Sequence, residues 1–258
     1  MALIPPFKCT ELATSAGTAS LPNEDYAAAG PDWAIVLDGA THSDGVDTGC
    51  IHDVSWLVSH LAAALTAQLT LNRVSLTEAL AAAIEGTCAA HADTCDLANP
   101  DSPSSTVAMV RVGKTGLEYL VLGDSAVIVK TPDRVRLVTD DRADYLQPGG
   151  RPYTRALVRS KRNTPGGFWV ASTKPRAAYE ARSGIASGAT HVALLTDGVT
   201  RLVAHYGYDW PQIFAVLDRD GPAALIDRVR DAERKSPPPT HRYGKRQDDA
   251  TAVHIRLA

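Results

Sequence analysis

The sequence predicts an α+β fold in which sheets pack together and helices cover their outer faces. The chain of 258 residues is 45% hydrophobic and 21% charged, which suffices for a sizeable core, and we expect a single domain over residues 1–258. Short segments rich in Val and Leu alternate with longer segments of helical periodicity. Their order is strands, two helices, strands, two helices and a final strand.

The first half of the chain contains a strand followed by two helices. Residues 33–37 form a short apolar run between Pro31 and Asp38, which predicts a buried strand. Apolar residues recur three and four apart over residues 51–71, and an Ala-rich segment over residues 76–92 repeats this pattern. Two long helices are therefore expected here.

The second half begins with short segments typical of strands. Residues 105–112, 118–122 and 126–130 are separated by turns that contain Gly, so we expect consecutive antiparallel strands. The remaining expectations are a long loop over residues 140–167, a strand over 191–195, helices over 210–218 and 223–234, a Pro-rich linker, and a last strand over 250–257.

Composition and charge exclude several classes of partner. The net charge of -3 is spread along the chain and gives no field that would hold nucleic acid or an anionic membrane. No signal sequence is evident at the start and no run of about 18 apolar residues occurs, so a cytoplasmic location without a membrane partner is expected. The four cysteines form no CxxC pair and are expected to be buried thiols.

Carboxylates follow apolar strands at three places in the sequence. The strands run into Asp38-Gly39, Gly123-Asp124 and Thr196-Asp197-Gly198, and further acids stand at Asn23-Glu24-Asp25 and Asp248-Asp249. Each Asp-Gly alone is more often a simple turn. Together, these oxygen ligands suit Mg²⁺ or Mn²⁺, and glycine allows the backbone to approach a cation closely.

Taken in order, these motifs resemble the PP2C (PPM) family of metal-dependent serine/threonine protein phosphatases, in its bacterial stand-alone form. The resemblance runs along nearly the whole chain, through Asn23-Glu24-Asp25, Asp38-Gly39, Ser104-Ser105-Thr106, Gly123-Asp124-Ser125, Thr139-Asp140-Asp141, Thr196-Asp197-Gly198 and Asp248-Asp249-Ala250-Thr251. It implies a four-layer α-β-β-α sandwich with two antiparallel sheets and a pair of Mn²⁺ or Mg²⁺ ions at one end, with a weaker third ion in many members.

The resemblance also implies roles for individual residues. Asp38 would bridge the two ions, Gly39 would offer its carbonyl oxygen, and Asp197 and Asp248 would complete the set of ligands for the two ions. Glu24 and Asp25 would hold metal-bound waters, and Asp249 would support the site from outside. Asp124 would bind the third ion. Such a centre activates a water that attacks phosphorus in line. Asp38 and Asp197 are thus the expected catalytic residues.

Four positions depart from the family pattern. Ser20 stands where the family has the arginine that grips the phosphate, and Ala126 ends the Gly-Asp-Ser-Arg motif. Ala40 replaces the histidine that donates a proton, so His42 becomes the candidate general acid. Arg201 replaces an acid that would bind the third ion, and is a candidate phosphate ligand.

These departures leave three functions open. The first is hydrolysis of phosphoserine or phosphothreonine in proteins, with the missing arginine replaced by Arg201 or by Arg151, Arg155 or Arg159. The second is hydrolysis of a small phosphorylated metabolite, and the third is a catalytically silent binding module. The basic residues 241–246 are expected only to solvate their charges, and none of the eight histidines shows a spacing typical of metal ligands.

Overall fold

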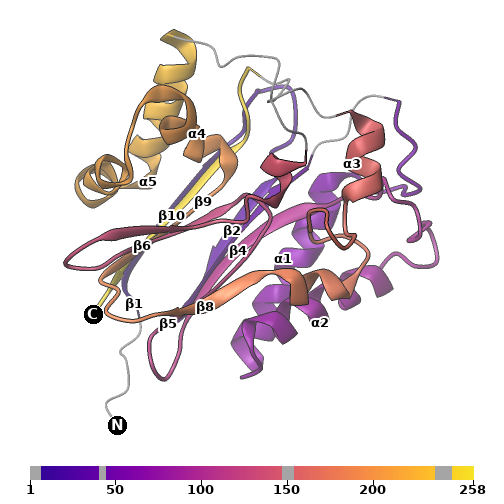
Figure 1. Cartoon of the computed structure of the whole chain (residues 1–258), viewed down its shortest axis with the longest axis horizontal. Helices are drawn as coiled ribbons and strands as arrows, with labels where there is room; N and C mark the ends of the chain where they lie inside the picture. Colours follow the sequence, from indigo (N-terminus) through magenta and orange to yellow (C-terminus); the bar gives the residue numbers. More distant parts are fainter. Residues whose placement is uncertain (1–6, 41–44, 147–153, 236–245) are drawn as a thin grey trace.

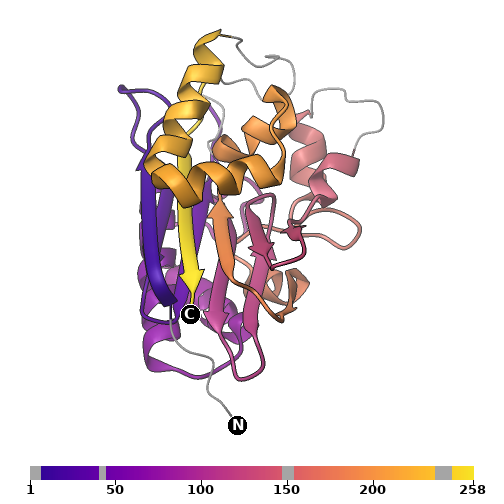
Figure 2. The same ribbon diagram turned by 90° about the vertical axis from the view of Figure 1, so that its left-hand side faces the viewer.

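The computed structural model describes residues 7–40, 45–146, 154–235 and 246–258. Two five-stranded antiparallel sheets lie face to face, and helices cover the outer face of each (Figure 1). The view from the side shows the helices of the C-terminal part lying across the first sheet (Figure 2). The expected α-β-β-α sandwich is therefore confirmed.

The first sheet has the order β1-β10-β9-β6-β7. Its strands are β1 (Phe7–Ser15), β10 (Ala250–Leu257), β9 (His191–Leu195), β6 (Ala126–Lys130) and β7 (Val135–Val138). The second sheet has the order β2-β3-β4-β5-β8. Its strands are β2 (Asp25–Ala29), β3 (Trp33–Gly39), β4 (Ser105–Val112), β5 (Leu117–Leu122) and β8 (Arg182–Ala186).

The helices divide between the two outer layers. Helices α1 (Val54–Leu71) and α2 (Leu76–Ala89) pack on the second sheet, and α4 (Asp197–Tyr206) and α5 (Trp210–Lys235) pack on the first. Helix α5 breaks at Gly221, whose φ of 81° is left-handed, and at Pro222, so it consists of the two shorter helices expected from the sequence. Three short helices lie between strands: η1 (Arg142–Tyr145), α3 (Arg155–Lys161) and η2 (Pro175–Glu180).

Three hydrophobic cores separate the four layers. Strand β3 contributes side chains to two of these cores, because side chains alternate between the two faces of a strand. Ile35 and Leu37 face α1 and α2, whereas Ala34 and Val36 face the first sheet. All four are fully buried, which explains why this strand appears in the sequence as a continuous apolar run.

The starts of α1 and α2 are fixed by side chains that cap them. Asp53 accepts a hydrogen bond from the backbone N–H of Trp56 at 2.8 Å, so α1 begins at Val54 and not at the expected residue 51. Ser75 and Glu78 form a capping box at the start of α2.

Several elements were missed by the sequence analysis. Strands β1, β2, β7 and β8 are short of Val and Leu or lie at sheet edges, where a mixed composition is tolerated. Helix α4 begins at Asp197, a position interpreted only as a turn after a strand. The expected loop over residues 140–167 holds η1 and α3 in its described parts, so the expectation of an unstructured segment was wrong there.

Helix α1 is unusually apolar, because it contains no Asp, Glu, Lys or Arg. Among the described residues it is the one helix long and apolar enough to cross a membrane by length and composition. Its buried side chains, such as Leu61 and Leu65, pack in the core against the second sheet. This is the packing of an amphipathic helix on a sheet.

The four cysteines are partly exposed, contrary to the expectation that they are buried. They are free thiols, as expected, although the sulfurs of Cys50 and Cys95 lie 2.8 Å apart.

Candidate metal centre

The expected carboxylates meet where the two sheets come together at one end. Asp25 and Asp38 are directly opposite each other in the antiparallel pair of β2 and β3. Thr196, at the end of β9 in the other sheet, donates a hydrogen bond to Asp25 Oδ2 at 2.9 Å. The backbone N–H of Asp197 lies 3.4 Å from Asp38 Oδ2. Residues more than 150 positions apart thus form one site.

Two glycines allow this close approach. A Cβ on Gly39 would lie 2.5 Å from Val54 Cγ1 and 2.7 Å from the carbonyl oxygen of Glu24, so no side chain fits there. A Cβ on Gly198 would lie 1.9 Å from the carbonyl oxygen of Asp249. Glycine at these positions brings the start of α4 and the end of β3 against the neighbouring backbone.

The carboxylates repel one another and are poorly hydrated. Burial, with further repulsion from Asp249 and Asp248, raises the pKa of Asp25 to about 7. Burial raises the pKa of Asp197 to about 8, and neighbouring Asp124 and Asp248 add to the effect. Burial and the charge of Asp197 raise the pKa of Asp38 well above its ordinary value. Such a cluster favours a bound cation, because the ionised form is destabilised without one.

Asp248 joins the cluster through an arginine. Arg201, only 3% exposed, lies on α4 and donates to Asp248 Oδ2 at 2.6 Å. Its other terminal nitrogen lies 3.4 Å from Oε1 of Glu233, which is fully buried in α5. The guanidinium therefore positions a carboxylate of the centre. The phosphate contact expected of Arg201 from the sequence stays a prediction, and in the structure its guanidinium contacts these two carboxylates.

Asp249 and Glu24 support the site from outside it. Asp249 accepts hydrogen bonds from the backbone N–H of Gly17 at 2.8 Å and of Glu24 at 2.7 Å. The carbonyl oxygen of Glu24 in turn accepts from the N–H of Gly39 at 3.1 Å. Asp249 thereby ties the segment before β2 to the segment before β10. The supporting position expected of Asp249 agrees with these contacts.

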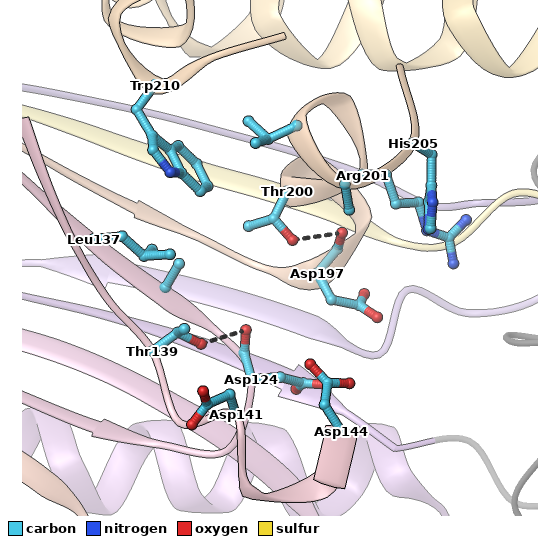
Figure 3. A pocket seen from close by; sticks show the side chains of 13 residues that line it. Asp124, Leu137, Thr139, Asp141, Asp144, Asp197, Thr200, Arg201, His205 and Trp210 are labelled. Atoms are coloured by element: carbon cyan, nitrogen blue, oxygen red, sulfur yellow. Dashed lines mark hydrogen bonds between the residues drawn. The ribbon is translucent and has the colours of Figure 1, made fainter. Parts of the chain in front are cut away.

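A pocket of about 200 Å³ opens beside the cluster, between α4 and the β6–β7 hairpin. Figure 3 shows Asp124, Asp144 and Asp197 on one side of it, and Trp210 and Leu137 on the other. Asp144, on η1, was missed because the sequence analysis treated its segment as a loop. Its place next to Asp124 makes it a candidate ligand for any additional ion at this edge.

Two other arginines expected to bind phosphate already contact a carboxylate. Arg155 and Arg159 on α3 both contact Asp101, the former at 2.8 Å. Ser20 is exposed, and its hydroxyl lies 3.5 Å from that of Thr18. Arg151 and His42 lie outside the described residues, so their expected roles stay predictions.

Arg246 was assigned to a solvated linker, but it lies beside the centre. It lines a second cavity, of about 340 Å³, together with Glu24, Asp248 and Asp249. Thr18 and Leu21, from the loop that carries Ser20, line the same cavity. The place of Arg246 beside the loop of Ser20 could be inferred only from the fold, because the two residues are far apart in the sequence.

The donor set fits the two Mn²⁺ or Mg²⁺ ions implied by the resemblance. All the candidate ligands offer oxygen, from Asp38, Asp197, Asp248 and Asp25, and from the carbonyl of Gly39. Hard divalent cations prefer such ligands. The raised pKa of Asp25 and of Asp197 supports the same assignment, because a cation would relieve the repulsion.

Solved structures of bacterial phosphatases share the fold. The PPM Ser-Thr phosphatase MsPP from Mycobacterium smegmatis is 19% identical, with a TM-score of 0.64 over 98% of this chain and 99% of that chain. The catalytic domain of the serine threonine protein phosphatase PstP, in complex with two manganese ions, is 16% identical, with a TM-score of 0.60 over 97% and 98%. Stp1 from Staphylococcus aureus is 14% identical, with a TM-score of 0.64 over 100% and 98%.

The family itself is established by the sequence. A comparison with curated proteins gives no match. The family model for protein phosphatase 2C, however, matches residues 14–229, which is most of the chain and includes Asp25, Asp38, Asp124 and Asp197. The chain therefore belongs to the PP2C (PPM) family of serine/threonine phosphatases.

Proposed function

We propose that this protein hydrolyses phosphoserine or phosphothreonine in proteins, using a water molecule and divalent cations held by the carboxylate cluster. One observation carries the proposal: Asp25, Asp38 and Asp197 converge from two sheets, although the charges of these residues repel one another. A purely structural role would favour neutral or paired side chains at such a position. Membership of the family supports the same conclusion.

Each residue of the cluster has a separate role in this proposal. Divalent cations, when bound, would lower the pKa of a water and stabilise the negative charge that develops on the phosphate oxygens. Asp38 and Asp197 would hold these cations, and the carbonyl oxygen of Gly39, the residue after Asp38, is a further candidate ligand. Asp25, fixed by the hydroxyl of Thr196, orients water at the edge of the cluster.

We infer that Arg246 supplies the phosphate contact that Ser20 cannot make. It borders the same cavity as the loop of Ser20 and stands two residues before Asp248. Its guanidinium can form two parallel hydrogen bonds with phosphate oxygens. The other arginines considered from the sequence within the described part of the chain, at positions 155, 159 and 201, already contact carboxylates.

The test is release of phosphate from a phosphothreonine peptide and from p-nitrophenyl phosphate, with saturating Mn²⁺. We expect turnover by the unmodified protein and a loss of at least about 100-fold in Asp38→Ala, since even changes in residues that only support a metal ligand cost about 10–100-fold. Asp133→Asn, an acid in the exposed turn between β6 and β7, is the matched control and should keep full activity.

The outcomes separate the three functions left open by the sequence. No turnover of either substrate, with two Mn²⁺ ions still bound in calorimetry, would favour a small phosphorylated metabolite. No turnover and no uptake of metal would favour a silent binding module and contradict the proposal. A cytoplasmic location and the absence of nucleic-acid and membrane partners stay predictions.

A further inference from the structure

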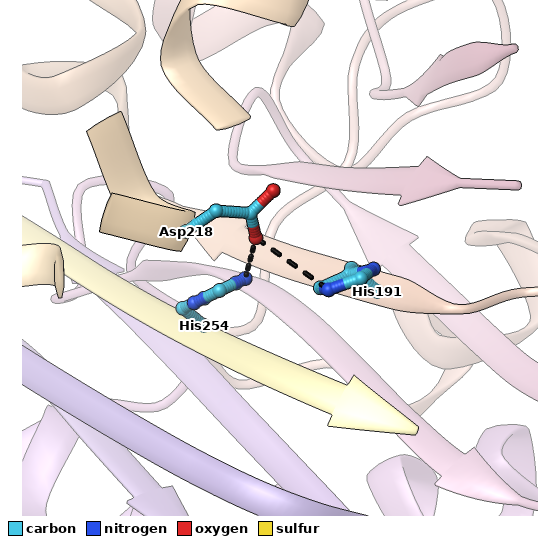
Figure 4. Close-up of side chains that lie close together, drawn as sticks. All are labelled: His191, Asp218 and His254. Atoms are coloured by element: carbon cyan, nitrogen blue, oxygen red, sulfur yellow. Dashed lines mark ion pairs between the residues drawn. The ribbon is translucent and has the colours of Figure 1, made fainter. Parts of the chain in front are cut away.

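A second group of potential metal ligands lies on the outer face of the first sheet. His191 is the first residue of β9, His254 lies on the neighbouring strand β10, and Asp218 lies on α5, which covers both. In Figure 4 the two imidazole rings project from the sheet toward the carboxylate of Asp218. One ligand atom from each of the three residues lies within 4.8 Å of the others.

The distances match those between ligands of one metal ion. Oδ1 of Asp218 lies 3.2 Å from Nε2 of His254 and 3.5 Å from Nε2 of His191. Two ligands that are each about 2.0–2.1 Å from a tetrahedral Zn²⁺ lie roughly 3.3–3.4 Å apart. Both histidines therefore present the same ring nitrogen to one oxygen, at the spacing that a shared ion requires.

The other nitrogen of each ring is directed to a different partner. Nδ1 of His191 lies 3.1 Å from the hydroxyl of Thr190, and Nδ1 of His254 lies 3.8 Å from Oε2 of Glu11. Lys130 contacts the second oxygen of Asp218 at 2.6 Å and leaves Oδ1 to the histidines. An oxygen that is hydrogen-bonded to the second ring nitrogen, as Thr190 is to His191, is typical of metal-binding histidines, whereas Glu11 lies beyond hydrogen-bonding distance of His254.

A simple ion pair explains the cluster less well. His254 is 1% exposed, and neither of its ring nitrogens makes a hydrogen bond with the described residues. Burial lowers the pKa of His254 and of His191, and the positive charge of nearby Arg256 lowers both further. The negative charge of Asp218 raises them, but not enough to cancel the effect of burial. Two neutral imidazoles would gain little from a carboxylate, but neutral imidazole is the form that binds metals.

We infer that His191, His254 and Asp218 form a second metal site, suited to a tetrahedral transition-metal ion such as Zn²⁺. Two nitrogens and one oxygen select such an ion over Mg²⁺, which prefers oxygen alone. The side chain of His191 is 25% exposed, so water can reach the ion and complete its four ligands. The bound ion would join α5 to the sheet three residues before the break at Gly221.

The site is tested by titrating the metal-free protein with Zn²⁺ and, separately, with Co²⁺, whose visible absorption reports a tetrahedral environment with nitrogen ligands. Saturating Mg²⁺ is present to occupy the carboxylate centre. We expect one ion per chain at this site. His191→Ala and Asp218→Asn alter partly exposed side chains, and each should weaken binding by at least about 100-fold, since the loss of a group that only supports a ligand already costs about 10–100-fold.

Two controls make the result decisive. Asp38→Ala disrupts only the carboxylate centre and should keep the Co²⁺ absorption, whereas His60→Ala, an exposed histidine on α1, should bind as the unmodified protein does. The inference is overturned if His191→Ala and Asp218→Asn bind Zn²⁺ as tightly as the unmodified protein, or if Asp38→Ala abolishes all uptake. Circular dichroism of each variant establishes that it is folded.

Discussion

Strands β9 and β10 carry a cluster of polar side chains at each end, and the two ends differ in how their charge is balanced. Asp197 and Asp248 adjoin one end, and His191 and His254 lie toward the other, six residues away along each strand, or roughly 20 Å. At the carboxylate end, Arg201 is the cation paired with Asp248, among several acids. At the histidine end, Asp218 has Lys130 as its own partner.

This difference makes a bound cation more favourable at the carboxylate end of the sandwich than at the histidine end. The carboxylate cluster is unfavourable by itself, and its energy is lowered when divalent ions bind. The histidine cluster is built of neutral rings and a paired carboxylate, so it is compatible with a folded protein with or without an ion. The basic side chain at each end, Arg201 or Lys130, should therefore differ greatly in its effect on the free energy of unfolding.

The largest expected loss of stability from a single substitution follows from removing Arg201. Arg201→Met leaves Glu233 buried with Arg230 as its remaining partner, at 3.0 Å, and removes the positive charge beside Asp248. Breaking a buried ion pair in this way costs about 3–5 kcal/mol of unfolding free energy. Urea unfolding of the metal-free protein would measure it.

Lys130→Met is the matched variant at the histidine end. Lys130 and Asp218 are each about one-third exposed, so the loss should be about 1 kcal/mol or less. Equal losses in the two variants would contradict the difference in charge balance between the ends.

A further effect concerns pH and again distinguishes the two ends. The pKa of Asp25 rises from 3.8 to about 7 and that of Asp197 to about 8 on folding, so the folded state holds protons that the unfolded state has released. The unfolding free energy of the metal-free protein should therefore fall as pH rises from about 4 to about 8. Mg²⁺ should remove this decline, because it replaces the protons.

The histidine end acts in the opposite direction. The pKa values of His191 and His254 lie below 6.5 in the folded state, so the unfolded state binds more protons and stability falls as pH drops through that value. Above about pH 7.5, one unit beyond the ordinary histidine pKa, these two histidines contribute little to the slope. Urea unfolding of Asp197→Asn should thus show a flatter profile between about pH 6.5 and about pH 8.5; an unchanged profile would exclude Asp197 as its source.

The sequence alone predicted the elements whose apolar pattern is strong. Strands β4, β6, β9 and β10 begin and end where expected, because both faces of these central strands are largely buried. Edge strand β8, with its polar residues and Gly184, gave no such pattern. The helix that begins at Asp197 was missed because an Asp-Gly pair is also typical of a turn.

The candidate site divides in the same way. Asp38, Asp124 and Asp197 were predicted because each adjoins a recognisable strand, whereas Asp25 was assigned through the resemblance. The structure brings Asp25, Asp38 and Asp197 together. The partners of the arginines could not be predicted, since they depend on which segments fold together. Arg201 contacts Glu233, 32 residues away, and Arg246 lines the same cavity as the loop of Ser20, which is distant in the sequence. His191 and His254 likewise become neighbours only through the pairing of β9 with β10.

The smallest expected effect is kinetic and concerns Arg246. If its guanidinium binds the substrate phosphate at the carboxylate end, Arg246→Ala should raise KM for p-nitrophenyl phosphate about 10-fold or more, since a hydrogen bond to a charged group contributes about 1.5–3 kcal/mol. Affinity for Mn²⁺ should not change, because arginine is no metal ligand. Arg246→Lys should restore part of the loss, as a point charge without paired hydrogen bonds.

Ser20→Arg in the Arg246→Ala background then tests whether the two positions serve the same phosphate. Arg246 and the loop of Ser20 border the cavity beside Asp248, so an arginine introduced from the loop side should lower KM again while leaving the number of bound Mn²⁺ ions unchanged. A KM that is unaffected by Arg246→Ala would mean that the metal ions alone bind the phosphate. The carboxylate end would then need no arginine for substrate, and Arg201 would be the cation that matters there, through Asp248.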